Sequence, residues 1–451
     1  MTVASAADQE NQAVVEWLTE NLGGMVTSFT RQSRWRPVWF ADMERDGEKS
    51  RVCVRGDRTD TALTWDLSHE MRFQKVLEEQ GIRVPKVYGW IDNPVAFVQE
   101  AVPGRPDFAD SSDEDRDRIV DEYLQEMVRV HSLPLQPFVD ANIDRAPTPE
   151  GSSVLGMQRM TAIFRRQKAG PDPLMEFFLA WFQRNLPKSR GRETPVLWDS
   201  GQFHHVDGHF VSIVDLETGH IGDPMMDLAG WRMRDSVIPF GKFSKIYDRY
   251  SELTGKPVDL QAIQLHHIFF TLANQLSFAH TLIDPPPSTD FATNLQWCNE
   301  TNLYATEALA ELLDIELPTV EVPKASPSRA APAYLQLVRT LSTLPVDNEY
   351  TRYRLRGAFR MARHLQRSDE IGAALLEADL DDVHQLMGTR FDSWLDSQVA
   401  LERFVLEKNA DGSLDEKLCV FFHKRNLRAQ MLNGPEGSAM SRHNPIQSFR
   451  D

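Results

Sequence analysis

The sequence has few cysteines, no long apolar run and no excess of basic residues. Its three cysteines, Cys53, Cys298 and Cys419, lie far apart and show no CxxC spacing. This pattern argues against a disulfide framework or a cysteine-rich zinc site and favours a reduced, cytoplasmic protein. No stretch approaches the ~18 consecutive apolar residues that span a bilayer. The first residues also lack the basic and apolar regions of a secretory signal. We therefore expect no membrane partner.

The charge balance argues against nucleic acid as the main partner. The net charge is −17 over 451 residues, whereas binding to duplex nucleic acid requires a basic face. The hydrophobic share of 41 % and the charged share of 25 % are ordinary for a folded globular protein. At roughly 150 residues per domain, the length predicts two or three domains.

Hydrophobic patterning makes the first hundred residues strand-rich. Apolar residues at helical spacing predict a helix over 8–22, and Gly23-Gly24 would end it. Alternating residues around Asp46-Gly47 predict a β-hairpin. A further helix is expected at 67–80, followed by two strands that end before Pro103.

The remainder of the chain has mainly helical patterns. A strand-rich segment at 195–217 interrupts them, and the Pro-, Ser- and Ala-rich stretch 317–333 predicts a linker. A loose tail is expected from Asn433. Between the linker and the tail we expect five helices, at 334–344, 349–367, 370–377, 379–386 and 392–407.

The strand-rich segment carries a cluster of oxygen ligands. Asp199 follows a short apolar run, Asp215 closes the apolar strand 210–214, and an Asp-Gly turn at 207–208 lies between them. Such a hairpin can bring Asp199, Gln202 and Asp215 to one mouth. Two carboxylates and an amide oxygen suit Mg²⁺. Phosphoryl transfer needs little beyond metal-held phosphates and a carboxylate that orients the attacking hydroxyl.

These residues belong to a longer pattern with a family resemblance. The run Asp199-Ser-Gly, Asp215-Leu-Glu217, Gly-Asp223-Pro and Asp227-Leu-Ala resembles the small-molecule kinase family typified by aminoglycoside phosphotransferases and choline kinases. That family shows H-G-D-x-x-x-x-N, then I-D-W-E, then G-D-P-x-x-D-L-A. The resemblance covers roughly residues 20–315. It implies a two-lobed, protein-kinase-like α+β fold, with a small β-rich N-lobe and a larger helical C-lobe.

The first half of the pattern departs from the family. Leu197-Trp198 stands where the family has His-Gly. Without a gap, His204 occupies the position of the family's Asn, and with a loop two residues shorter Gln202 does. Gln can offer a carbonyl oxygen to Mg²⁺, which is a better match than a His nitrogen. Both alignments stay open at this point.

The resemblance assigns a role to each carboxylate of the segment. Asp199 would be the catalytic residue that faces the acceptor hydroxyl. Asp215 would hold the metal, together with Gln202 or His204. Three further acids would support the loops or lie on the substrate side: Glu217, Asp223 and Asp227.

The N-terminal part would bind the nucleotide. Arg55 occupies the place of the family's phosphate-gripping Lys, and an Arg can clamp phosphate oxygens with two parallel bonds. Glu70 would pair with Arg55, and residues 22–30 would form the loop that covers the phosphates. The hinge strand, whose backbone meets the adenine, would contribute Gln99, Glu100 and Val102.

Taken together, the sequence predicts a nucleotide-binding N-lobe at 1–102, a helical C-lobe with the catalytic and metal loops at 103–316, a linker at 317–333 and an additional C-terminal helical segment at 334–451. We expect that segment to pack back onto the kinase body, because its apolar stripes need a partner.

The expected activity is an ATP-dependent O-phosphotransferase for a small hydroxylated molecule, with Mg²⁺ as the metal. Mn²⁺ and GTP are the alternatives to Mg²⁺ and ATP, and a homo-oligomer is compatible with this interpretation. We favour a hydroxylated metabolite or a hydroxyacyl thioester. Apolar residues at 260–300 could wall such an acceptor, although plain core packing is the favoured interpretation of these residues. The rival interpretations are an antibiotic-modifying phosphotransferase and a catalytically silent, kinase-like binding module.

Overall fold

The structure is a computed structural model that describes residues 6–32, 36–58, 61–188, 191–287, 289–346 and 349–449. By the density of its internal contacts the chain forms two compact units. The first consists of Met1–Gly156, Lys188–Leu260 and Phe449–Asp451, and the second of Met157–Pro187 and Gln261–Ser448. The predicted domain boundaries at 102, 316 and 333 stay predictions.

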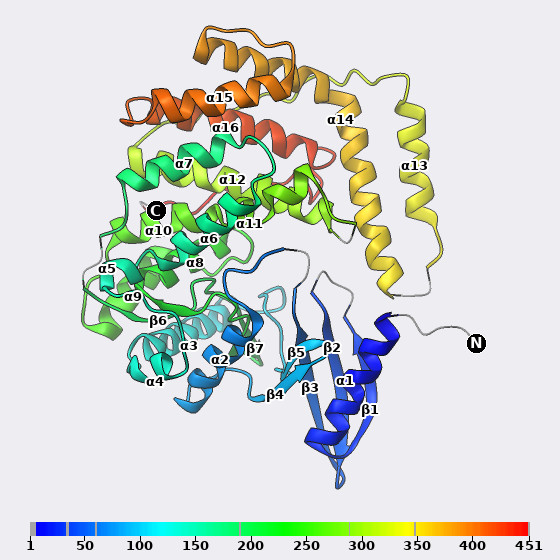
Figure 1. Cartoon of the computed structure of the whole chain (residues 1–451), viewed down its shortest axis with the longest axis vertical. Coiled ribbons are helices and arrows are strands. Elements are labelled where there is room, and N and C mark those ends of the chain that lie inside the picture. Colours follow the sequence, from blue (N-terminus) through cyan, green and yellow to red (C-terminus); the bar gives the residue numbers. More distant parts are fainter. Residues whose placement is uncertain are drawn as a thin grey trace. The chain divides into compact units, whose positions relative to one another are not determined.

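The first unit begins with a five-stranded antiparallel sheet (Figure 1). Its strand order is β1-β2-β3-β5-β4. The strands are β1 (Met25–Arg31), β2 (Val38–Arg45), β3 (Glu48–Gly56), β4 (Val87–Asp92) and β5 (Val95–Glu100). β1 occupies most of the stretch 22–30, so the prediction of a phosphate-covering loop there is wrong. The alternation of Met25–Arg31 between the two faces of the sheet explains the strand.

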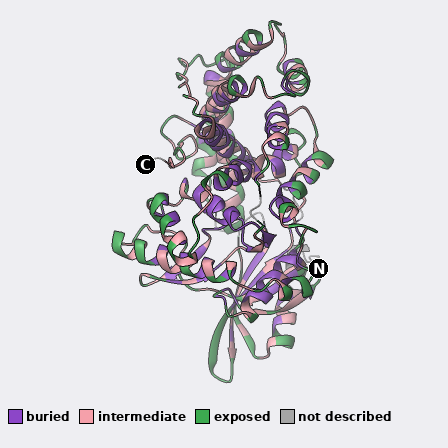
Figure 2. Cartoon of the chain, turned by 90° about the vertical axis from the view of Figure 1, so that its left-hand side faces the viewer, coloured by how far each residue is buried: buried purple, intermediate pink, exposed green. Residues whose placement is uncertain are grey.

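The predicted hairpin is the pair β2–β3. Asp46 and Gly47 connect the strands, and both have positive φ angles, of 53° and 82°. A two-residue turn of this kind matches the right-handed twist of the strands. Its tip, from Arg45 to Ser50, is exposed and stands out in green in Figure 2.

Two helices cover this sheet or flank it. On α1 (Ala6–Leu22), the side chains of Val14 and Leu18 are fully buried against sheet residues such as Trp39 and Val98. α2 (Leu67–Glu79) lies between β3 and β4 in the chain and begins at Asp66, whose side chain accepts from the backbone N–H of His69. Such a cap satisfies an otherwise unpaired donor at the helix start.

The rest of the first unit holds the strand-rich segment predicted at 195–217 and the helices around it. β6 pairs with β9, and β7 pairs with β8. The elements are α3 (Asp113–His131), α4 (Gln136–Asp140), α5 (Pro149–Ser152), β6 (Thr194–Val196), β7 (Phe203–Val206), β8 (His209–Ile213), β9 (His220–Gly222), α8 (Met225–Asp235) and α9 (Phe243–Thr254). A β-rich part followed by helices gives the predicted α+β class.

Among the described residues of the second unit, the regular elements are all helices. Its helices are α6 (Leu155–Gln167), α7 (Pro173–Arg184), α10 (Leu260–Thr271), α11 (Ala273–Ile283), α12 (Phe291–Leu313), α13 (Ala331–Thr343), α14 (Glu349–Met387), α15 (Trp394–Lys408) and α16 (Asp415–Leu432). α14 is one helix of 39 residues, where the sequence predicted three. α16 was not predicted. Within the described residues, no helix combines the length and the apolar character that a bilayer crossing requires.

The C-terminal helices pack against the earlier helices of this unit. α16 lies along α12, α15 lies against α7, and α13 runs beside α14 (Figure 1). The rings of Phe177 on α7 and Phe422 on α16 stack with their centroids 5.5 Å apart. The carboxylate of Glu402 lies 2.6 Å from Lys168 Nζ. Residues beyond the linker therefore share one core with α7 and α12.

Candidate active site

Asp199 and Asp215 lie in the two loops that flank the β7–β8 hairpin. Asp199 follows β6, and Asp215 follows β8. The turn of the β7–β8 hairpin is Asp207-Gly208, and both residues have positive φ. The backbone N–H of Val214 donates to the carbonyl of Gln202 over 3.0 Å, which fixes Gln202 opposite the residue before Asp215. The structure thus places Asp199, Gln202 and Asp215 close together, as the sequence predicted.

Both carboxylate oxygens of Asp199 have side-chain partners. Gln202 Nε2 donates to Asp199 Oδ2 over 2.9 Å, and Arg234 on α8 forms an ion pair with Oδ1. Burial raises the pKa of Asp199 above its usual value, while the nearby charge of Arg234 opposes the rise. The Asp199 side chain keeps 19 % of its surface exposed, so a small molecule can reach it.

The side chain of Asp227 stabilises the loop that carries Asp199. The carboxylate of Asp227 is fully buried and accepts the backbone N–H groups of Leu197 and Trp198 over 3.0 and 2.6 Å. His131 Nε2 lies 2.9 Å from the same carboxylate, and His131 Nδ1 lies 2.9 Å from the hydroxyl of Tyr250. These bonds indicate that Asp227 stabilises the loop and does not face the open side of the site.

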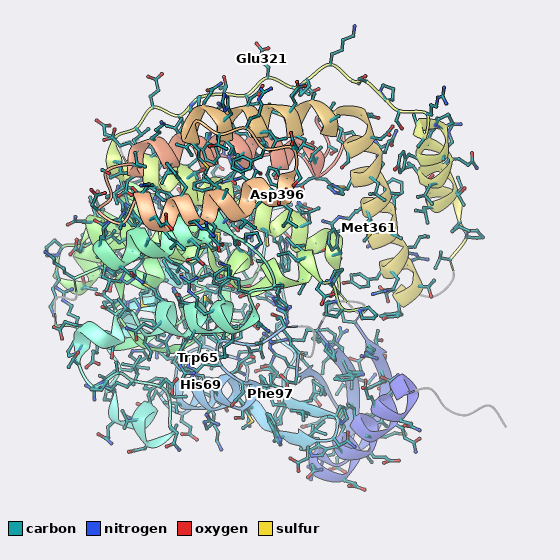
Figure 3. The ribbon with its side chains drawn as sticks, turned by 45° about the horizontal axis from the view of Figure 1, so that its top comes forward. Trp65, His69, Phe97, Glu321, Met361 and Asp396 are labelled. Atoms are coloured by element: carbon teal, nitrogen blue, oxygen red, sulfur yellow. The ribbon has the colours of Figure 1, made fainter. Side chains whose placement is uncertain are left out.

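Trp198 has a backbone conformation that favours glycine. Its φ is +61°, in the left-handed region that costs an ordinary residue about 1–2 kcal/mol. Its buried ring meets Trp65 edge-on with 6.3 Å between centroids, and Trp65 in turn stacks on His69 (Figure 3). The family has Gly at this position, and the geometry explains that preference. In this chain the packing of the ring and the bond to Asp227 hold the strained residue.

A cluster of charged side chains links the five-stranded sheet to the loop after β8. Arg55 on β3 reaches Glu70 on α2 with 2.7 Å between Nε and Oε1, and it also forms an ion pair with Asp215. Its guanidinium lies 3.6 Å from Glu217. Arg36 lies 3.3 Å from Glu70 and 2.6 Å from Glu217. The predicted pair of Arg55 and Glu70 is therefore part of a five-residue network.

The electrostatics of this network favour a charged Arg55. Three carboxylates face two guanidinium groups, and burial raises the pKa of one of these acids, Glu70, while the charge of Arg55 opposes the rise. Burial alone would lower the pKa of Arg55, but the attraction of Asp215, Glu70 and Glu217 raises it instead. Glu70 is 3 % exposed, whereas Asp215 and Glu217 are 29 % and 25 % exposed. The buried Glu70 therefore has a structural role, whereas the partly exposed Asp215 and Glu217 can contact a ligand.

Gln202 and His204 occupy different places. Gln202 lies beside Asp199, to which its amide donates. His204 on β7 instead places its Nδ1 3.3 Å from the carbonyl oxygen of Val102 and 3.2 Å from that of Pro103. These carbonyls belong to the segment after β5. The geometry therefore groups Gln202 with the two catalytic-loop carboxylates and His204 with the hinge.

The donor set fits a magnesium ion held partly by a substrate. Among the residues that the structure describes, no three His, Cys, Asp or Glu side chains converge on one point as a complete metal site. Mg²⁺ is often held by one or two carboxylates together with substrate phosphates and water. Asp215 and the amide oxygen of Gln202 offer the hard oxygen ligands for this arrangement.

The remaining predicted residues lie around this centre. Gln99 accepts from Gln74 Nε2 on α2 over 2.7 Å, and the backbone N–H of Glu100 donates to the Lys86 carbonyl over 2.8 Å. The carboxylate of Asp223 is buried, which raises its pKa, and accepts the N–H of Met225 at the start of α8. Their assignment to nucleotide or substrate stays a prediction.

Sequence reasoning missed two arginines of the site. Arg36 is 1 % exposed and joins two acids of the network, yet it precedes β2 in a stretch without a motif. Arg234 lies seven residues after Asp227, the last acid of the family pattern. Its place on α8, two helical turns after Asp227, was the available signal, since residues at this spacing share a helix face.

Comparisons with known proteins agree with this architecture. A sequence profile described as the phosphotransferase enzyme family matches residues 38–266, just over half of the chain. No curated protein sequence matches significantly. The macrolide 2′-phosphotransferase MphH of Brachybacterium faecium, solved as the apoenzyme, is 16 % identical over 61 % of this chain and 94 % of its own, with a TM-score of 0.45.

Two further solved structures are similar to the same degree. A type I macrolide 2′-phosphotransferase is 17 % identical over 65 % of this chain and 97 % of its own, with a TM-score of 0.46. A thermostable mutant of aminoglycoside phosphotransferase APH(4)-Ia, with ADP and hygromycin B, is 13 % identical over 64 % of this chain and 97 % of its own, with a TM-score of 0.45. At such distances these names do not identify the acceptor. The profile match, which spans Arg55, Asp199 and Asp215, shows that this chain belongs to the phosphotransferase enzyme family and confirms the expected small-molecule kinase with an alcohol group as acceptor.

Proposed function

We propose that the enzyme is an ATP-dependent O-phosphotransferase that uses Mg²⁺ and phosphorylates a hydroxyl group of a small molecule. One observation carries the proposal. Asp199 and Asp215 lie in the two loops that flank the β7–β8 hairpin, and Asp215 contacts the Arg55–Glu70 pair. A base, a metal carboxylate and a phosphate-gripping cation thereby meet in one place, and phosphoryl transfer requires these three groups.

The residues divide the reaction between them. The acceptor hydroxyl oxygen forms a bond to the γ-phosphorus, the bond from that phosphorus to the β–γ bridging oxygen breaks, and ADP leaves. Asp199 orients the hydroxyl and receives its proton. Arg55 holds the phosphates that do not react. Mg²⁺, when bound, neutralises charge on the phosphate oxygens, and Asp215 and Gln202 would hold it.

For the acceptor we favour a hydroxylated metabolite or a hydroxyacyl thioester over a polycationic antibiotic. Arg234 supports this choice, because its guanidinium contacts the carboxylate that faces the acceptor. The apolar residues at 260–300 do not contribute to the choice. Phe269, Phe270 and Phe278 are buried in α10 and α11 of the second unit, where they form core.

The test compares wild type with Asp199→Asn in Mg²⁺-dependent transfer from ATP to a panel of hydroxyl compounds. Turnover should fall about 10²–10⁴-fold, the scale of a positioned general base, while ATP affinity is retained. Asp207→Asn is the matched control, since Asp207 is an exposed turn residue with φ +50° that Asn tolerates. Turnover of Asp199→Asn close to that of the control would contradict the proposal.

A further inference from the structure

Arg234 occupies a position that the catalytic step does not require. It lies in the last turn of α8, and its guanidinium forms an ion pair with Asp199 Oδ1. The Asp199 Oδ2 atom already accepts from Gln202. Each carboxylate oxygen can accept a second bond, so an acceptor hydroxyl can approach Asp199 beside these donors and then lies next to the Arg234 guanidinium.

The two donors differ in how readily they can be displaced. Gln202 is neutral, and the N–H of Val214 bonds to its backbone carbonyl and leaves the side-chain amide free to move. Arg234 carries a full charge, and its side chain is only 22 % exposed. A partly buried charge that loses its partner is strongly disfavoured. Displacement of Arg234 therefore needs a replacement anion, which neither a neutral nor a cationic acceptor provides.

We propose that the acceptor carries an anionic group close to its reacting hydroxyl, and that Arg234 binds this group with the donors that Asp199 leaves unused. The inference rests on the proposed function, because it names the acceptor class of the same site. A carboxylate and a phosphate share the required chemistry, since each accepts two parallel hydrogen bonds from a guanidinium. Arg234 then acts as a specificity-determining residue.

The guanidinium has capacity for the new partner. Among the described residues, the buried Arg234 Nε has no hydrogen-bond partner. A guanidinium has five N–H donors in a planar fork, and the ion pair with Asp199 engages one nitrogen. An acceptor amine would instead meet this cation at short range in a partly buried site, where like charges repel more strongly than in water.

The first experiment compares acceptors that share one chain of hydroxyls and differ in the end group. Gluconate carries a carboxylate, sorbitol is neutral, N-methylglucamine carries an amine, and sorbitol 6-phosphate carries a phosphate. With wild type and Mg²⁺-ATP, we expect kcat/KM for at least one anionic compound to exceed that for sorbitol by about tenfold or more, as one charge-assisted hydrogen bond provides. Gluconate and sorbitol 6-phosphate distinguish the two sources of the anion. Equal or better use of sorbitol or the amine overturns the inference.

The second experiment replaces the arginine. Arg234→Gln should raise KM for the anionic compound about 10–100-fold and leave KM for ATP unchanged, whereas Arg234→Lys should restore part of the difference. Arg249→Gln is the matched control, because Arg249 is a half-exposed helical arginine of the same unit that pairs with Asp121. A structural role alone would lower the activity toward sorbitol and gluconate equally, and that result overturns the inference.

A binding measurement separates this inference from the proposed function. Calorimetry without nucleotide should show that wild type binds the anionic compounds more tightly than sorbitol and that Arg234→Gln loses this preference. Absence of the preference in wild type overturns the inference even if phosphoryl transfer occurs. Conversely, absence of transfer to every compound contradicts the proposed function while the binding preference still supports an anion site at Arg234.

Discussion

Trp198 keeps a backbone conformation that glycine adopts more readily. Its φ of +61° suits glycine, but its ring is fully buried and its N–H donates to Asp227. Gly156 and Gly230 make room for it, since a Cβ on either would lie 2.4 Å or less from Trp198. The strain sits directly before Asp199, where it fixes the direction of the catalytic loop.

Two substitutions at this position separate strain from packing. Trp198→Ala and Trp198→Gly both remove the ring and should each cost about 2–5 kcal/mol of unfolding free energy. Trp198→Gly should nevertheless be the more stable of the two by about 1 kcal/mol, because Gly accepts a positive φ without penalty. Chemical denaturation of both variants measures the difference. The usual order, with Ala above Gly, would contradict the strained conformation.

His220 gives the first unit a pH-dependent stability. Burial lowers its pKa to about 4 from the ordinary 6.5. Below pH 6.5 the unfolded chain binds a proton at this residue while the folded chain does not, so stability falls as the pH decreases from 6.5 towards 4. The contribution is about 1.4 kcal/mol per pH unit across this window. His220→Gln should flatten the dependence of the melting temperature on pH, and the exposed His209→Gln should not.

The second metal ligand is also decided at the residue scale. Gln202→Ala should weaken the binding of Mg²⁺-ATP more than His204→Ala does, because Gln202 lies with Asp199 and His204 faces the carbonyls of Val102 and Pro103. Asp215→Ala should weaken it most, since it removes a charged ligand. Titration calorimetry with and without Mg²⁺ ranks the three variants. A larger effect of His204→Ala would favour the ungapped alignment instead.

At the same scale, the sequence predicted the acids of the site better than their basic partners. Asp199, Asp215 and Asp227 stand in a spaced pattern with a chemical meaning, and the structure brings the first two into neighbouring loops. Arg36 has no such pattern, because its partner Glu217 follows it by 181 positions. Arg234 lies two helical turns after Asp227, but its ion pair with Asp199 joins two different elements. Only the tertiary fold creates these pairs.

Among the elements, α14 is the clearest difference from the sequence-based expectation. The pattern at 349–386 predicted breaks near residues 368 and 378, yet the helix continues from Glu349 to Met387. Polar residues such as Ser368 and Asp369 interrupt the apolar stripe but carry no helix-breaking chemistry. α16 was missed because its apolar residues surround the helix instead of forming a stripe, as expected for a helix buried on several sides. The hairpin at Asp46-Gly47, in contrast, has a local cause and was predictable.

The glycines of α14 test its continuity. A Cβ at Gly357 or Gly372 would meet its nearest neighbour at 3.9 or 3.7 Å, which is ordinary contact. Gly357→Ala and Gly372→Ala should each stabilise the protein by about 0.5–1 kcal/mol, because Ala favours a helix interior. Gly388→Ala is the control of opposite sign. Gly388 has φ +75° just beyond the helix end, so Ala should destabilise there. Loss of stability in Gly372→Ala would indicate a break in α14.

At the scale of the whole molecule, the C-terminal helices complete the core of the second unit. Leu418 and Cys419 of α16 are fully buried, and Phe422 is 1 % exposed. α16 lies along α12, and the carboxylate of Asp415 at its start lies 2.6 Å from Arg184 on α7. Sequence composition indicated that the apolar stripes beyond the linker need a partner, but it did not identify α7 and α12 as that partner.

This arrangement predicts different results for cutting the linker and for deleting the C-terminal helices. Glu321 is exposed on the extended segment before α13 (Figure 3). A protease site inserted there should give a nicked protein whose two fragments co-elute in gel filtration and retain phosphotransferase activity, because side-chain contacts hold α15 and α16 in place. A chain truncated after residue 316 should instead be insoluble. It would expose the faces of α7 and α12 that Phe422 and its neighbours cover, and large exposed apolar patches promote aggregation. A soluble, active 1–316 fragment would mean that these helices form an independent appendage, in contradiction to the shared core.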